Sequence, residues 1–458
     1  MLSIKNFLLL IIIFLLVGCS NLRTRDAYKE PLLQNAQHRN YSGAIRIIEE
    51  AQEKSFTEKD KVLYHLYLGI LFHYDKNYNA SIYHLNQAED LIDELYTKSI
   101  SRAASSILLN DNTLAYSGED YEDIYINIFK ALNFINMKDI DAAFVEIRKV
   151  NIKLNLLEDK YKEYANKLNS SDDSKIEVSV KSTQFNNSAL ARYLSMLLYR
   201  AENSMDDARI DKEYIEEAFR LQSHIYYFSP PDLSTFEPTR SNKANLTFVS
   251  FIGLAPEKYP ITYRVATLED MIIVFSDNGS QANGQHFPFP GVSPGYYFKF
   301  AIPQIREKKS EINRISIEVN GRSFGTLEKI EDVNKIAKET FEVKANMAYV
   351  RAITRTVVKG IASILAQKEI EKRTGELGGL LAKFGTAAIT EASEAADLRS
   401  CSIFPGFAYV GDYQIDPGIY DIRVVYHNKN GMVDYVEEIP QYEVKRNNLN
   451  LIESYYLK

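Results

Sequence analysis

Two amphipathic helical segments joined by a short turn, within Val62 to Leu91, constrain the fold of this chain more than any other feature. Gly69 in the first segment is small, and the second segment carries an apolar set that includes Ile82, Leu85 and Ala88. Small residues at fixed offsets let two helices approach, and large residues fill the space between them. A unit of this kind, about 34 residues long, cannot bury its apolar face alone and stacks on copies of itself.

Further copies of the pattern can be aligned along the chain. The run Asn40-Tyr41, followed by Ala44-Ile45, parallels Asn77-Tyr78, followed by Ser81-Ile82. A third copy surrounds Asp139-Ile140 and Ala143-Phe144, and a looser fourth includes Leu194, Ser195, Leu198, Asp207 and Ala208. In series, these copies resemble tetratricopeptide repeats, which implies a helical repeat array over residues 31–222. One amphipathic helical bundle without superhelical order is the alternative.

A targeting segment precedes the helices. Lys5 supplies a positive charge, and Phe7 to Val17 is an apolar run too short to span a bilayer as a stable helix. The run ends in Leu16-Val17-Gly18-Cys19, which resembles the lipobox of bacterial lipoproteins. The resemblance implies that residues 1–18 are a signal peptide and that Cys19 carries lipid at the start of a tether over residues 19–30. An ordinary signal peptide or a buried core helix is the alternative.

The lipobox also bears on location and on the cysteines. Ser20 rather than aspartate after Cys19 favours the outer membrane of a bacterial cell envelope, with the acyl chains as the membrane contact. The chain has only one other cysteine, Cys401. Cys19 and Cys401 could form a disulfide, but acylation of Cys19 would leave Cys401 as a buried free thiol.

A polar insertion separates the second and third copies, and it carries two distinctive blocks, Asn110-Asp111-Asn112 and Tyr116-Ser117-Gly118-Glu119-Asp120-Tyr121-Glu122. With the later segment Ala131-Leu132-Asn133-Phe134, these blocks resemble a family of uncharacterised bacterial lipoproteins with a tetratricopeptide-like N-terminal half and a β-rich C-terminal half. The resemblance covers most of the mature chain and implies an architecture and an envelope location, but no activity. The two blocks supply the candidate binding residues: Asn110, Asp111, Asn112, Tyr116, Gly118, Glu119 and Tyr121.

The carboxylates of this insertion could bind a cation. Oxygen ligands such as those of Asp111, Glu119 and Asp123 suit calcium, but the spacing of an EF-hand loop is not present. Helix capping in a solvated loop is the favoured interpretation, so no metal or cofactor is predicted. A second segment, Asp397-Leu398-Arg399-Ser400, also resembles a block of the family. That block usually continues with Trp, and Cys401 stands there instead, which weakens a functional role for it.

The hydrophobic period changes to two after a proline-marked linker over residues 223–244. Asn320-Gly321 predicts a tight hairpin, because this dipeptide is the strongest short hairpin signal. These patterns predict a β-sandwich-like domain over residues 245–346 and 402–458. The expected strands cover residues 246–251, 261–265, 271–275, 296–302, 315–319, 408–414, 420–427, 433–438 and 448–456.

Helical sequence interrupts the strand pattern. We expect a short helix over residues 327–341 and an inserted helical hairpin over residues 347–401, rich in small residues such as Gly360. Close helix packing is the first interpretation, and a lipid-handling role of residues 347–397 is the alternative, which frequent charges oppose. A basic stripe on the first arm could face an acidic stripe on the second: Arg351, Arg355 and Lys359 against Glu391, Glu394 and Asp397.

Patterns for catalysis are sparse. Gly321-Arg322-Ser323-Phe324-Gly325 matches a nucleophile elbow, with His427 as a late base, but the hairpin at Asn320-Gly321 places Ser323 on a return strand. The histidines show no metal-ligand spacing, since His65 and His73 are too far apart for the one-turn pair of a zinc helix. The net charge of −7 argues against nucleic-acid binding.

These observations predict an α+β multidomain protein with a tetratricopeptide-like array followed by a β-sandwich-like domain that contains a helical hairpin. The favoured function is a non-enzymatic, lipid-anchored scaffold for a protein partner in the envelope. A serine hydrolase that uses Ser323 and a lipid-handling hairpin are the alternatives.

Overall fold

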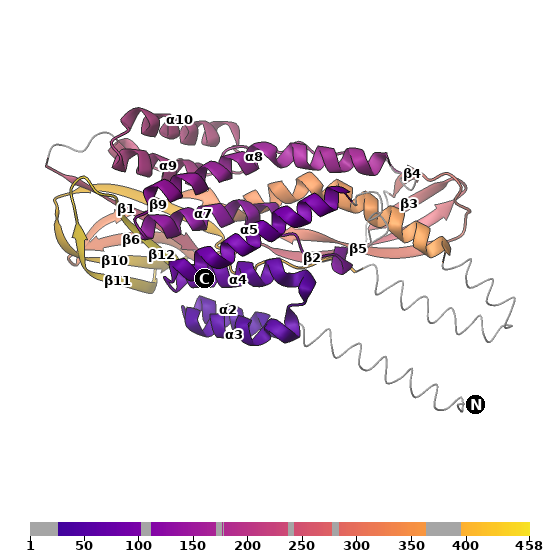
Figure 1. The fold of residues 1–458 in the computed structure, drawn as a ribbon, viewed down its shortest axis with the longest axis horizontal. Helices are drawn as coiled ribbons and strands as arrows, with labels where there is room; N and C mark the ends of the chain where they lie inside the picture. The colour runs from indigo at the N-terminus through magenta and orange to yellow at the C-terminus, as the bar shows by residue number, and fades with distance from the viewer. Residues whose placement is uncertain are drawn as a thin grey trace, which may run out of the picture.

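The computed structural model describes residues 26–101, 111–170, 176, 178–236, 242–276, 284–362 and 395–458. Helices fill the N-terminal half and β-sheets the C-terminal half, so the protein is of mixed α+β class (Figure 1). The helices before the first strand are α2 (Lys29–Gln37), α3 (Tyr41–Ser55), α4 (Lys61–Tyr74), α5 (Tyr78–Ser101), α7 (Asp120–Asn136), α8 (Ile140–Asn169), α9 (Ala189–Ala201) and α10 (Met205–Leu221).

One three-residue turn recurs between the helices of four pairs, α2/α3, α4/α5, α7/α8 and α9/α10. The middle residue of each turn is left-handed, with φ between 61° and 63°, at Arg39, Lys76, Lys138 and Asn203. The next residue donates its backbone N–H to a carbonyl five positions earlier, as Asn77 does to Phe72. Its side chain caps the following helix in three of the turns, from Asn40, Asn77 and Asp139. The four pairs therefore share one local turn geometry.

Small side chains let paired helices approach closely, as the sequence predicts. A Cβ atom added to Gly69 of α4 would lie 2.5 Å from Cδ2 of Leu85 in α5, so only glycine fits at this contact. The position four residues after each polar turn residue is also small and fully buried, at Ala44, Ser81, Ala143 and Ala208.

The strands form three four-stranded sheets, with the orders β12-β1-β9-β8, β11-β10-β6-β7 and β4-β3-β2-β5. The early and late strand blocks expected from the sequence both contribute to the first two sheets. The strands are β1 (Ala244–Ile252), β2 (Glu257–Leu268), β3 (Met271–Ser276), β4 (Gln285–Pro288), β5 (Tyr297–Arg306), β6 (Ile312–Val319), β7 (Arg322–Thr326), β8 (Glu328–Asp332), β9 (Phe407–Ile415), β10 (Gly418–Asn428), β11 (Val433–Val444) and β12 (Asn450–Tyr456).

The sheet that contains β1 has a different partner on each face. Leu246 and Phe248 of β1 share a core with Ile317 of the sheet β11-β10-β6-β7. Val249 and Phe251, which point the other way, belong to the large core formed with the helices. The alternation of apolar residues along β1 therefore places helices on one side of the sheet and strands on the other.

The hairpin predicted at Asn320-Gly321 is present between β6 and β7. Both residues have positive φ, 50° and 75°, as a type I′ turn requires. Ser323 is exposed on β7, which continues as a strand, so the segment lacks the strand-to-helix turn of a nucleophile elbow. The Nε2 atom of His427 lies 2.8 Å from the hydroxyl of Ser316, not from Ser323.

One helix over residues 333–362 follows β8 directly, which corrects two expectations. Residues 328–332, expected within a short helix, form β8 and pair with β9. The helix then continues through residues 341–347, where a break was expected, because that segment contains neither glycine nor proline. Strand β8 was missed because its partner β9 is distant in the sequence. The second arm expected for the helical hairpin lies mostly outside the described residues.

The described part of this helix packs on the sheet β4-β3-β2-β5. Ile353 and Val357 share a core with Val265 and Phe300. A Cβ atom on Gly360 would lie 2.1 Å from the Phe298 ring, so this small residue permits contact with a strand. In the part of the chain that the structure describes, no helix is long and apolar enough to cross a bilayer.

The segment predicted as a linker is packed against the protein over its described residues. Ile225 and Tyr226 are buried in the helical core, and Leu233 is buried near the strands.

Glu331 of β8 is fully buried at the N-terminus of α9. Its carboxylate accepts a hydrogen bond from the Leu190 backbone N–H (2.6 Å) and one from the Ser188 hydroxyl (2.9 Å). Burial nevertheless raises the pKa of Glu331 to about 7.

The raised pKa of Glu331 predicts a pH-dependent stability. The folded protein holds a proton on Glu331 that the unfolded chain loses near pH 4.5, so the free energy of unfolding falls as pH rises from about 4.5 to 7. The contribution is at most about 3 kcal/mol. Urea unfolding at pH 5 and pH 8 should show a smaller difference in Glu331→Gln than in the wild type. Glu328→Gln, at an exposed position of the same strand, is the control. Equal pH dependence in wild type and Glu331→Gln would contradict this assignment.

Candidate functional site

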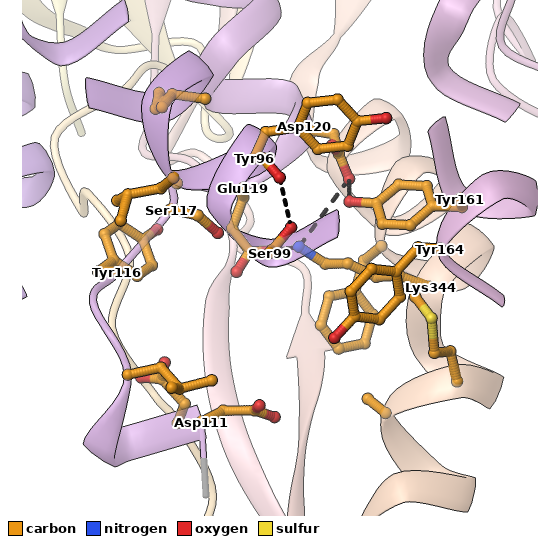
Figure 2. Close-up of a pocket in the computed structure, with 18 of the residues that line it drawn as sticks. Tyr96, Ser99, Asp111, Tyr116, Ser117, Glu119, Asp120, Tyr161, Tyr164 and Lys344 are labelled. Carbon is orange, nitrogen blue, oxygen red and sulfur yellow. Dashed lines mark hydrogen bonds and ion pairs between the residues drawn. The ribbon is translucent and has the colours of Figure 1, made fainter. Parts of the chain in front are cut away.

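A cavity of about 380 Å³ lies where α5, the loop before α7, α8 and the helix over residues 333–362 meet (Figure 2). Strands β2 and β5 add Lys258 and Pro303, so both halves of the chain contribute to it. Its walls are part apolar and part aromatic. The apolar residues include Ile92, Leu95, Leu114, Phe341 and Met347, and the tyrosines are Tyr96, Tyr116, Tyr161 and Tyr164.

Two lysines from the second half of the chain meet the carboxylates at the start of α7. Lys344 Nζ lies 2.9 Å from Oε2 of Glu119 and 3.9 Å from Oδ2 of Asp120, and Lys258 pairs with the other oxygen of Glu119. Burial alone would lower the pKa of Lys344, but Glu119 outweighs it and holds that pKa well above its usual value. Lys344 is therefore charged, and both lysines pair with Glu119 in the cavity wall.

The neighbouring carboxylates also have cationic partners. Asp120 accepts a hydrogen bond from the Tyr161 hydroxyl (2.7 Å) and lies 3.2 Å from Lys160 Nζ; Figure 2 shows Tyr161 and Lys344 pointing at it. Burial raises the pKa of Asp120, but Lys160 and then Lys344 lower it below its usual value. Asp123 pairs with a lysine of α8 in the same way. Lysine side chains thus supply the positive charge here, and the described residues contain no group of three metal-ligating side chains.

A capping box begins α7, as the interpretation of these carboxylates as helix caps predicts. Glu119 is the N-cap residue, and Glu122 accepts a hydrogen bond from its backbone N–H (2.9 Å). Glu122 is fully buried and also accepts hydrogen bonds from the Tyr116 hydroxyl (2.6 Å) and the Cys401 backbone N–H (2.7 Å). Burial raises the pKa of Glu122. One carboxylate therefore joins the loop, the helix and the segment that contains Cys401.

Arg399 holds the loop that forms one wall of the cavity. Its guanidinium lies 2.8 Å from Asp397 and 3.1 Å from Asp60, and it donates to the backbone carbonyls of Asp111 and Leu114, each at 3.0 Å. Burial raises the pKa of Asp397, but the hydrogen bond from Arg399 lowers it to about 2. The guanidinium also lies 5.3 Å from the centroid of the Tyr116 ring. The block that contains Arg399 therefore has a structural role, because its guanidinium attaches this loop to the rest of the protein.

The structure brings four of the seven candidate binding residues into the cavity wall: Asp111, Tyr116, Gly118 and Glu119. Asn112 instead donates to the backbone carbonyls of Ala395 and Ala396, at 2.7 and 3.0 Å. Tyr121 is buried in the core, with its ring 6.1 Å from that of Phe404. Asn110 lies outside the described residues.

Sequence reasoning did not identify the partners of these residues. Lys258, Lys344 and Lys160 are distant from the candidate blocks in the sequence, and no local motif marks them. Arg351 was noted only as part of a basic stripe, and its guanidinium lies 3.3 Å from Asp111. The expected acidic partners Glu391 and Glu394 lie outside the described residues.

The structure describes one of the two cysteines, Cys401. Cys401 is fully buried and free, as predicted, and burial raises the pKa of its thiol well above the usual value. Cys19, the expected lipidation site, lies outside the described residues.

No known protein family, curated protein or solved structure matches this chain in comparison.

Proposed function

We propose that this chain is a non-enzymatic scaffold in which the cavity binds a segment of a partner protein. In this proposal the helices form a tetratricopeptide-like superhelix, and the two sheets that share a core form a sandwich. A lipid on Cys19 tethers the protein in a bacterial cell envelope, at the outer membrane.

The arrangement of the helices supports the superhelix. Each of the four pairs is joined by the same three-residue turn, and successive pairs pack on one another in chain order, α3 on α4, α5 on α7 and α8 on α9. Repeated hairpins stacked in order are the structural unit of helical solenoids, which bind partners along their surfaces. The shared core of the sheets that contain β1 and β6 supports the sandwich.

The composition of the cavity wall carries the proposal that it binds a peptide. Its four tyrosines offer aromatic contact area with few rotatable bonds. The charged side chains of the wall already pair with one another, namely Glu119, Asp120, Lys258 and Lys344. A ligand therefore needs no net charge to bind in the cavity. A volume of about 380 Å³ accommodates a few side chains rather than a folded domain.

Photo-crosslinking in intact cells tests this function. Replacing Tyr96, which lines the cavity, with a photoreactive benzoylphenylalanine should give a reproducible adduct with one protein, identified by mass spectrometry. The same replacement at Tyr297, which is 78% exposed on β5 and away from the cavity wall, is the control and should not give that adduct. The proposal is wrong if Tyr96 gives no specific adduct or if both positions capture the same proteins.

A further inference from the structure

Two histidines that are distant in sequence meet on the α4/α5 pair. A hydrogen bond of 2.9 Å joins Nδ1 of His65 in α4 to Nδ1 of His84 in α5, so one ring donates its N–H to the other. Their ring centroids are 5.2 Å apart, and the ring planes differ by 36°. Both side chains are partly exposed, so solvent and small ions can reach them. The tight contact of Gly69 with Leu85 fixes the spacing of the two helices that carry them.

Lys61, one turn before His65 on α4, is paired with Glu58 at 2.7 Å, so its charge does little to repel a cation at this position.

Aromatic side chains hold the two rings in place. The Phe72 ring stacks on His84, with centroids 5.5 Å apart and an angle of 13° between the planes. Tyr64 contacts the edges of both imidazoles, at centroid distances of 5.4 and 6.4 Å. Such packing restricts rotation of the rings, and with the hydrogen bond between them it keeps the two Nδ1 atoms close.

We propose that His65 and His84 form a binding site for a divalent copper ion, coordinated through the two Nδ1 atoms. Two nitrogens bound at right angles, each about 2.0 Å from a metal, lie about 2.8 Å apart, whereas tetrahedral coordination separates them by about 3.3 Å. The hydrogen-bonded nitrogens, 2.9 Å apart, are close to the first of these separations, so Cu²⁺ can replace the proton that they share with little movement of the rings. The proton leaves to water, and in the complex each ring carries one proton, on Nε2. Water completes the coordination on the exposed side. This site is separate from the cavity and does not depend on the proposed scaffold function.

Copper binding to the full-length protein in detergent, without a histidine tag, tests the site. Calorimetric titration with Cu²⁺ should show one site per chain, and the electron paramagnetic resonance spectrum should show hyperfine coupling to two nitrogens. We expect His65→Gln and His84→Gln each to weaken binding at least about tenfold. His286→Gln, at an exposed position on β4, is the matched control and should bind like the wild type.

Circular dichroism of each variant separates loss of the site from loss of the fold. A wild-type spectrum without coupling to two nitrogens overturns the proposal, whatever the variants do. Unchanged affinity in both His65→Gln and His84→Gln overturns it as well. Tighter binding of Zn²⁺ than of Cu²⁺ would overturn the assignment of the metal.

Discussion

Replacing Arg399 with methionine is expected to lower the free energy of unfolding by about 3–5 kcal/mol. The side chain of Arg399 is 11% exposed, and those of its partners Asp60 and Asp397 are 2% and 13% exposed. Methionine keeps much of the packing volume but removes the guanidinium with which both of these carboxylates pair. It also removes the donors to the carbonyls of Asp111 and Leu114, so the loop beside the cavity loses its attachment.

Urea unfolding at pH 7 measures the effect, with Arg423→Met as the matched control. Arg423 also pairs with a glutamate, Glu318 at 2.7 Å, but its side chain is 41% exposed. Water and salt screen an exposed pair, so this control should change the free energy of unfolding by less than about 1 kcal/mol. Similar losses in the two variants would show that Arg399 has no special role in holding the loop.

The second large effect is expected at the contact between Gly69 and Leu85. Gly69→Val should destabilise the protein by about 1–3 kcal/mol, because its Cβ atom would lie 2.5 Å from Leu85 Cδ2 in a close-packed interface. Leu85 is fully buried, and Leu85→Ala alone should cost about 2–5 kcal/mol through the cavity it leaves. The double variant should lose less than the sum of the two, because valine fills the space that leucine vacates.

A double-mutant cycle measured by urea unfolding tests this compensation. The control combines Gly69→Val with Leu154→Ala. Leu154 is buried in α8, and it is not among the residues nearest to a Cβ atom at position 69. The control pair should be additive within about 0.5 kcal/mol. Additivity of Gly69→Val with Leu85→Ala would mean that these residues do not set the helix spacing.

Features encoded by neighbouring residues were predictable from the sequence. The polar residue before each second helix, the carboxylates at the start of α7 and the Asn320-Gly321 hairpin act within a few positions, so their spacing alone indicates their roles. The alternation in β1 likewise predicts a strand with two different faces.

Features that depend on contacts between distant segments were not predictable in this way. Strand β8 is defined by its pairing with β9, and residues 327–341 read alone resemble a helix. Only the acidic residues of the cavity could be predicted, because they belong to one distinctive block of the sequence. Lys258 and Lys344 come from positions in the second half that no motif marks. His65 and His84 were missed for the same reason, since only the packing of α4 on α5 brings them together.

If a partner protein enters the cavity, a side chain that fills the cavity should prevent its binding. Ala348 lines the cavity, and tryptophan at this position would occupy a large part of its volume. The measurement is the yield of the crosslinked adduct from Tyr96 in cells that carry Ala348→Trp, compared with Tyr297→Trp on the exposed edge of β5. We expect the adduct to disappear with Ala348→Trp and to persist with Tyr297→Trp, at equal amounts of folded protein. If the adduct is undiminished when the cavity is filled, the partner does not bind in the cavity.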